Sequence, residues 1–169
     1  MDRHNYNLSQ ENIKNGHIIA NNGLLAIRKN IFDSNNKQVF SIGQIKNKIS
    51  FNITCMNRRH HLEQTLVQNI EKNSIPGRVE FVLLDYNSTD GLEEWVKELQ
   101  YYIDTGILVY YRTEEPLNYH RTHSRNMAFR LSTGDIVCNL DADNFLGEGF
   151  ASYILDIFNQ GDETFFCTP

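Results

Sequence analysis

The chain has 169 residues, of which 40% are hydrophobic and 22% charged, and its formal net charge is −5. This composition suits one domain with a hydrophobic core, and the acidic balance argues against nucleic acid as a partner. The N-terminus is polar and no apolar run approaches the roughly 20 residues of a membrane span, so we expect a cytoplasmic protein without a transmembrane helix.

Residues 1–48 differ in character from the rest of the chain. They are rich in Asn and Lys and contain short apolar runs at His17–Ala20, Leu24–Ile27 and 38–42. Turn-forming residues separate these runs. The segment is predicted to be a small N-terminal β extension, a hairpin or a meander, or else the tail of a preceding module.

From residue 49 onward, strand-like and helix-like segments alternate. Apolar runs of strand length lie at residues 50–55, 79–84, 107–111, 136–140 and 164–167. Helical spacing of apolar residues is found at residues 61–73, from 90 onward, at 124–131 and around 150–158. Asp90 and Glu93 have the spacing of a capping box at the start of the second helix. The alternation predicts an α/β domain at residues 49–169, with a single Rossmann-like, mostly parallel sheet flanked by helices.

A polar pair of carboxylates follows the strand predicted at residues 136–140. In parallel sheets, ligands bind beyond the carboxyl ends of the strands, where the strand order reverses. Asp141 and Asp143 are separated by one small residue, and carboxylates this close repel unless a positive group lies between them. Mn²⁺ and Mg²⁺ prefer oxygen ligands of this kind. The pair indicates a divalent metal site, with a solvated acidic turn as the alternative.

Two other polar clusters follow predicted strands. Thr54, Asn57 and Arg58 offer a hydroxyl, an amide and a guanidinium for a ligand, or they form an ordinary loop in which Asn57 caps the next helix. Asp85 offers a carboxylate that could accept hydrogen bonds from a ligand, or it is a turn residue. Both interpretations remain open for each cluster.

A group of cationic side chains lies at the start of the helix predicted at residues 124–131. It consists of His120, Arg121, His123 and Arg125. An anionic diphosphate near the start of this helix would suit these residues. A zinc site is the weaker interpretation, because no third ligand accompanies the two histidines.

Three stretches together resemble the family 2 glycosyltransferases with the GT-A fold. They are residues 49–58 (ISFNITCMNR), 80–91 (EFVLLDYNSTDG) and 124–144 (SRNMAFRLSTGDIVCNLDADN), in the order and spacing of that family. The resemblance implies a nucleotide diphosphate sugar, most often a UDP-sugar, as donor and a carbohydrate or glycan as acceptor. It further implies Mn²⁺ or Mg²⁺ as cofactor and an inverting transfer to an acceptor hydroxyl, as in polysaccharide biosynthesis.

The resemblance also implies roles for single residues. Thr54 matches a threonine near the base, and Asp85 with Tyr86 matches the pair that flanks the uracil ring, although many members have a second acidic residue where Tyr86 stands. Asp143 matches the direct metal ligand, and Asn126 an asparagine of the helix beneath the donor. The predicted nucleotide-binding residues are Thr54, Asn57, Arg58, Asp85, Tyr86, Arg125, Asn126 and Asp141, and the predicted metal ligands are Asp141 and Asp143.

No catalytic residue is assigned from the sequence. In the family, the acceptor-binding region and the catalytic carboxylate follow the metal motif, so the general base is expected beyond Pro169, in a missing C-terminal region, or on a second chain. Two alternative functions accompany the main one. The first is a catalytically silent nucleotide- or carbohydrate-binding module, and the second is an Asp-based phosphotransferase.

Overall fold

The computed structural model describes residues 17–20, 24–27 and 47–159. In the N-terminal region, β1 (His17–Ala20) and β2 (Leu24–Ile27) pair in antiparallel fashion. The apolar runs at 38–42 and 164–167 lie outside the described residues. Within the described part of the chain, no helix is both long and apolar enough to cross a lipid bilayer.

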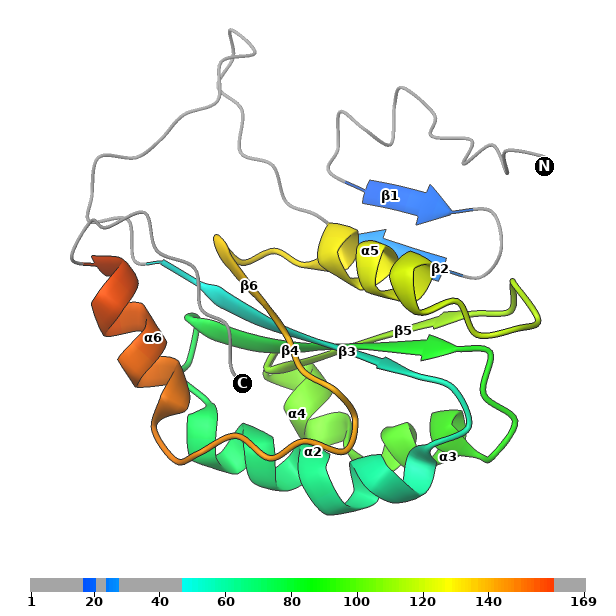
Figure 1. The fold of residues 1–169 in the computed structure, drawn as a ribbon, viewed down its shortest axis with the longest axis horizontal. Coiled ribbons are helices and arrows are strands. Elements are labelled where there is room, and N and C mark those ends of the chain that lie inside the picture. The colour runs from blue at the N-terminus through cyan, green and yellow to red at the C-terminus, as the bar shows by residue number, and fades with distance from the viewer. Residues whose placement is uncertain (1–16, 21–23, 28–46, 160–169) are drawn as a thin grey trace, which may run out of the picture.

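The rest of the structure is a four-stranded parallel sheet between two layers of helices (Figure 1). The strands are β3 (Ile49–Cys55), β4 (Val79–Tyr86), β5 (Leu108–Thr113) and β6 (Ile136–Asn139), in the order β5-β4-β3-β6. The helices are α2 (Arg59–Asn73), α3 (Leu92–Glu98), α4 (Gln100–Asp104), α5 (Arg121–Leu131) and α6 (Phe150–Asn159). The predicted fold class, a single mostly parallel α/β sheet, is confirmed.

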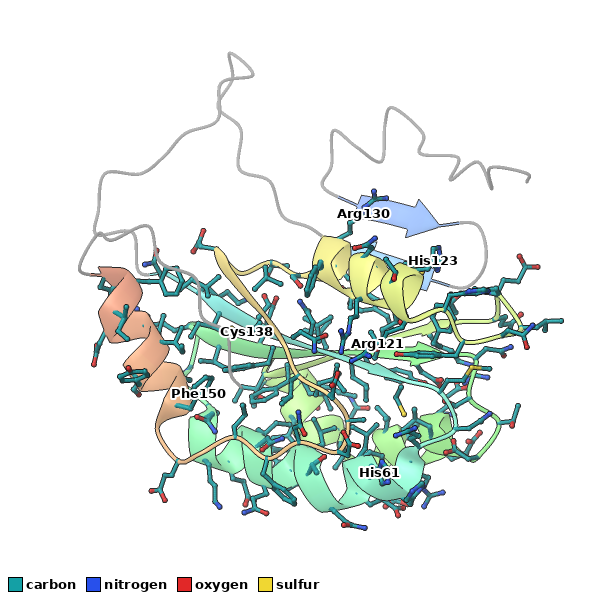
Figure 2. The ribbon with its side chains drawn as sticks, viewed as in Figure 1. His61, Arg121, His123, Arg130, Cys138 and Phe150 are labelled. Carbon is teal, nitrogen blue, oxygen red and sulfur yellow. The ribbon has the colours of Figure 1, made fainter. Side chains whose placement is uncertain are left out.

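Alternate residues of each strand point to opposite faces of the sheet, so each face has apolar side chains to bury. Helices cover both faces. On one face, Phe51 stacks on Phe81 with ring centroids 5.1 Å apart. The ring centroid of Phe150 on α6, which Figure 2 labels, lies 6.3 Å from that of Phe51. The other face is smaller and packs Val82 and its neighbours against α5. Every residue of β4 is buried, as expected for a strand with helices on both sides.

The predicted capping box at the start of the second helix is wrong. Helix α3 begins at Leu92, after Gly91 in the left-handed conformation (φ 79°), and no side chain caps it. The Asp90 carboxylate accepts a hydrogen bond from the backbone amide of Arg59 instead, at 2.8 Å. Asp90 therefore satisfies the first turn of α2, where an unpaired amide would otherwise remain. Spacing in the sequence could not show that Asp90 lies beside a different helix.

Glu80 ties the amino-terminal ends of the strands together. This buried carboxylate accepts hydrogen bonds from Lys48, from the Ser50 hydroxyl at 2.6 Å, and from both the amide and the hydroxyl of Thr133 at 2.7 Å. Burial raises the pKa of Glu80, but the hydrogen bonds from Lys48, Ser50 and Thr133 lower it by more, so the pKa lies below its ordinary value. Gly134 is required next to this cluster, because a Cβ there would lie 2.6 Å from the Ser50 hydroxyl.

Replacing Glu80 by Gln should destabilise the fold in a pH-dependent way. The amide nitrogen of Gln would face donors, and leaving a buried group unsatisfied costs about 1–3 kcal/mol. Because the folded-state pKa is depressed, the carboxylate stabilises the fold above its unfolded pKa of 4.5, and this stabilisation is lost as the pH falls through the folded value. The difference in unfolding free energy between wild type and Glu80→Gln should therefore shrink as the pH is lowered below 4.5.

Denaturant titrations at several pH values measure this difference. Glu63→Gln is the matched control, because Glu63 pairs with Arg59 at the surface and such pairs contribute about 1 kcal/mol or less. A Glu80→Gln variant as stable as wild type at neutral pH would contradict the role given to this carboxylate.

Candidate functional site

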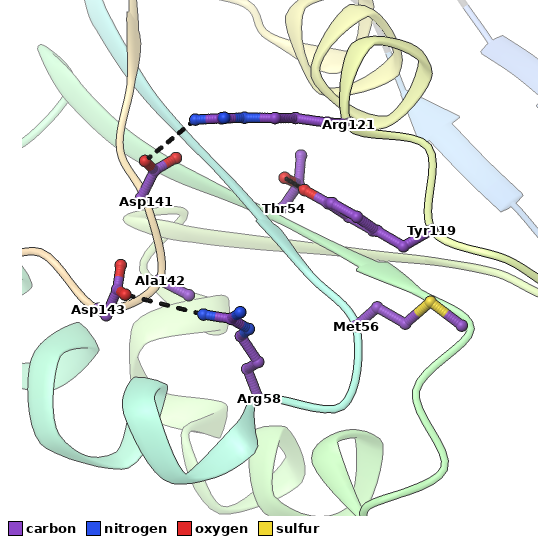
Figure 3. A pocket seen from close by; sticks show the side chains of 8 residues that line it. All are labelled: Thr54, Met56, Arg58, Tyr119, Arg121, Asp141, Ala142 and Asp143. Atoms are coloured by element: carbon purple, nitrogen blue, oxygen red, sulfur yellow. Dashed lines mark hydrogen bonds and ion pairs between the residues drawn. The ribbon is translucent and has the colours of Figure 1, made fainter.

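The strand order changes direction at β3. The chain runs from β3 outward to β4 and β5, then crosses back to place β6 on the other side of β3. A pocket of about 510 Å³ opens at the carboxyl ends of β3 and β6, and we call it the switch-point pocket (Figure 3). Its lining residues are Thr54, Met56, Arg58, Tyr119, Arg121, Asp141, Ala142 and Asp143. Both the position and the volume are typical of ligand sites in open α/β sheets.

Asp141 is held by cationic and amide groups. Its carboxylate accepts hydrogen bonds from the Arg125 guanidinium at 2.6 Å and from the Asn139 amide at 3.1 Å, and the Arg121 guanidinium lies 3.9 Å away. Burial raises the pKa of Asp141, but the hydrogen bonds from Asn139 and Arg125 and the charges of both arginines lower it by more. Asp141 is therefore a firmly ionised carboxylate in the wall of the pocket.

Asp143 has a looser environment. Its nearest cationic partner is Arg58, at 3.8 Å, and the Asp143 side chain is 50% exposed, against 42% for Asp141. Within residues 17–20, 24–27 and 47–159, no group of three or more His, Cys, Asp or Glu side chains is gathered closely enough to hold a metal. The two aspartates are thus the carboxylate ligands that this pocket offers, and a metal there would need further oxygen ligands from a substrate or from water.

The end of the pocket opposite the aspartates has a different chemistry. Met56 and Tyr119 lie there, on the side away from Asp141 and Asp143 (Figure 3). The Tyr119 hydroxyl is 2.9 Å from the Thr54 hydroxyl, and its ring meets the ring of Tyr86 edge-on with centroids 5.7 Å apart. Tyr86 is fully buried, and its hydroxyl lies 2.7 Å from Nδ1 of His123. The pocket therefore has a charged end and an aromatic, hydroxyl-bearing end.

Asp85 does not line the pocket. It is fully buried and accepts hydrogen bonds from the Tyr110 hydroxyl and the Ser88 amide, both at 2.8 Å, and from the Arg112 guanidinium. Burial and the Asp85 charge raise the pKa of Tyr110; burial lowers the pKa of Arg112, but Asp85 raises it by more. The carboxylate thus connects β4, β5 and the turn after β4.

Four further residues of the predicted nucleotide-binding set lie outside the lining, namely Asn57, Tyr86, Arg125 and Asn126. Asn57 has a left-handed backbone (φ 56°), and its side-chain oxygen accepts a hydrogen bond from the Thr89 amide at 2.7 Å. Asn57 does not cap α2, because Arg58 occupies the cap position. Asn126 is exposed on α5 and does not line the pocket.

The structure thus brings together part of the predicted site. Thr54, Arg58, Asp141 and Asp143 line the pocket, and Arg125 reaches it by holding Asp141. The nucleotide-binding prediction did not include Tyr119, although this residue lines the pocket. Arg121 was recognisable from the sequence by its place in the cationic cluster. Figure 3 shows its side chain reaching from the start of α5 toward Asp141. Tyr119 gave no comparable signal, because its position depends on the crossover from β5 to α5.

Comparisons with known proteins give a family from the sequence and a fold from the structure. A family model described as glycosyl transferase family 2 matches residues 50–169. The structure is similar to the mannosyltransferase PcManGT from Pyrobaculum calidifontis in complex with GDP-Man and Mn²⁺, with a TM-score of 0.57 and 23% identity over 72% of this chain and 34% of that one. It is also similar to S. aureus TarS 1–349 in complex with UDP-GlcNAc, with a TM-score of 0.56 and 18% identity over 67% of this chain and 31% of that one. The chain thus spans about a third of the length of these structures. The search of curated proteins found no match.

Replacing Asp85 by Asn should destabilise the fold. The Asn amide nitrogen would face Arg112 and Tyr110, and removing one partner of a buried ion pair costs about 3 kcal/mol or more. Denaturant titration measures the loss. Glu93→Gln is the matched control. The Glu93 carboxylate lies at the surface, 3.6 Å from the same guanidinium, and its loss should lower the unfolding free energy by about 1 kcal/mol or less. Equal stability losses in the two variants would contradict the structural role of Asp85.

Proposed function

This chain belongs to glycosyl transferase family 2, and from that premise we propose that its switch-point pocket binds a nucleotide diphosphate sugar together with a divalent metal. The proposal rests on one observation: Asp141 and Asp143 line one pocket at the carboxyl ends of β3 and β6, and each is paired with arginine side chains there. Family membership sets aside the alternative of an Asp-based phosphotransferase.

The charged end of the pocket suits a diphosphate. Arg58 directly precedes α2, and Arg121 is the first residue of α5, so each helix start contributes a guanidinium to the pocket. Guanidinium groups form paired hydrogen bonds with phosphate oxygens, and helix N-termini favour anions. Arg125 would remain on Asp141 and hold that carboxylate in place.

The two carboxylates fit a divalent cation of the hard, oxygen-preferring kind. Such a cation is commonly bound by one or two carboxylates while substrate phosphates fill other positions. We assign Mn²⁺ or Mg²⁺ to Asp141 and Asp143, with the more exposed Asp143 as the main ligand. The complex of PcManGT with GDP-Man and Mn²⁺ supports the choice of metal. When bound, the metal would neutralise charge on the departing diphosphate.

The aromatic end of the pocket suits a nucleoside. Tyr119 and Met56 offer surface for the base, and Thr54 offers a hydroxyl for hydrogen bonding. We propose that Asp85 and Tyr86 act on the donor through their neighbours: Asp85 through the turn after β4, and Tyr86 by supporting the ring of Tyr119. Asn57, linked to the same turn through Thr89, belongs with them.

The proposal also covers the identity of the donor and the type of reaction. The relatives were solved with GDP-Man and with UDP-GlcNAc, so both UDP and GDP are suitable probes. We propose that the sugar is transferred to a glycan hydroxyl with inversion at the anomeric carbon, and that this reaction takes place in the cytoplasm. The acids of the pocket lining, Asp141 and Asp143, are assigned to the metal, so no residue described here is assigned as the general base. Sugar transfer in a turnover assay would separate an enzyme from a silent binding module.

Binding of UDP or GDP should depend on metal and on Asp143. Calorimetry in the presence of Mn²⁺ should show binding that a chelator greatly weakens. Loss of a group that only orients a metal ligand typically costs about 10–100-fold in metal affinity. Asp143→Asn removes a ligand itself, so it should lower the Mn²⁺-dependent affinity by at least about 10-fold. The same substitution should not weaken binding in chelator, because without metal the Asp143 carboxylate repels the diphosphate. Asp156→Asn, at an exposed carboxylate on α6, is the matched control and should bind like wild type.

Two outcomes would count against this proposal. The metal assignment fails if wild type binds both nucleotides equally well with Mn²⁺ and with chelator. The residue assignment fails if Asp143→Asn and Asp156→Asn behave alike.

A further inference from the structure

A row of polar side chains lies on the buried face of α2. Thr65, Asn69 and Asn73 are four residues apart, and each is at most 3% exposed. Residues at this spacing lie above one another on a helix. Polar groups this deeply buried are costly unless they are hydrogen-bonded, so their partners indicate what the row does.

The first member of the row holds the residue between the two aspartates. The Thr65 hydroxyl lies 2.7 Å from the backbone oxygen of Ala142 and 3.1 Å from that of His61 in its own helix, and its single proton is given to the nearer acceptor, Ala142. Ala142 is itself only 6% exposed, while Asp141 and Asp143 on either side of it extend into the pocket. Thr65 therefore fixes the midpoint of the Asp141-Ala142-Asp143 segment from behind.

The second member holds the segment that follows. The Asn69 amide donates to the backbone oxygen of Asn144 at 2.9 Å, and its side-chain oxygen accepts from the amide of Leu146 at 2.7 Å. The third member holds a different element: the side-chain oxygen of Asn73 accepts from the amide of Ala151 at 3.0 Å, in the first turn of α6. Only the first two members of the row, Thr65 and Asn69, bond to the segment that contains the aspartates.

The segment from 140 to 149 is neither helix nor strand, so its position depends on such contacts. We propose that Thr65 and Asn69 are positioning residues that set the placement of Asp141 and Asp143 for the metal and the diphosphate. The inference rests on the proposed function. Groups that orient metal ligands without touching the metal act in this way, and their loss typically costs about 10–100-fold in metal affinity. Asn73 has the same chemistry on the same face but holds α6.

The test uses a pair of substitutions at residue 65. Thr65→Val keeps the shape and removes the donor, whereas Thr65→Ser keeps the donor. Mn²⁺ affinity is measured by electron paramagnetic resonance in saturating UDP or GDP, with thermal melts in parallel. We expect Thr65→Val to weaken Mn²⁺ binding by about 10–100-fold. Thr65→Ser should bind Mn²⁺ like wild type, and a merely structural role for the hydroxyl would not produce this split.

A second pair of substitutions separates loss of Mn²⁺ binding from loss of stability. Asn69→Asp and Asn73→Asp place the same charge on the same buried face, and each keeps its acceptor oxygen. Both should lower the melting temperature, but only Asn69→Asp should weaken Mn²⁺ binding.

The results distinguish a failure of the proposed function from a failure of the positioning role of Thr65 and Asn69. If wild type binds neither nucleotide with Mn²⁺, the proposed function fails and this inference fails with it. If wild type binds, and Thr65→Val and Asn69→Asp retain wild-type Mn²⁺ affinity, the inference alone is overturned.

Discussion

The parallel pairing of β3 with β4 on one side and β6 on the other determines where a ligand can bind. The crossover from β3 to β4 runs through α2 on one face of the sheet, and the crossover from β5 to β6 runs through α5 on the other (Figure 1). The starts of α2 and α5 therefore lie on either side of the carboxyl ends of β3 and β6. Each start contributes an arginine, Arg58 and Arg121, to the pocket between them. The sheet order thus brings together positive groups that are 63 residues apart in the chain.

The same constraint explains how two aspartates can lie so close together. Asp141 is balanced by Arg125 and Arg121, and Asp143 lies near Arg58, so the repulsion between the carboxylates is offset by cations from both helices. A metal and a diphosphate bring charges of both signs to this pocket, where both kinds of partner are already present. Helix α2 has two roles in this arrangement, because it follows Arg58 directly and its buried face holds the segment that contains the aspartates.

The sequence was sufficient for the strands and for the family. Apolar runs of strand length predicted β3 to β6. The rule for carboxyl ends of strands pointed to the polar clusters at residues 54–58, 85–88 and 141–144, and members of the first and the last of these line one pocket. Asp85 shows where such reasoning stops: its partner Arg112 lies on β5, opposite Asp85 in the register, and no local pattern reveals that pairing. The capping box failed for a similar reason, since Asp90 caps α2 across space. The row on α2 is visible in the sequence as three polar residues at four-residue spacing on an apolar helix face. Its role could be inferred only once the loop that it contacts was known.

A crystal structure with Mn²⁺ and either UDP or GDP would test the central claim most directly, by means of the anomalous signal of the metal. The account predicts a manganese peak within bonding distance of Asp143 or of both aspartates, with the diphosphate beside it and the base toward Tyr119 and Met56. A nucleotide bound elsewhere on the molecule, or a manganese peak remote from Asp141 and Asp143, would contradict it.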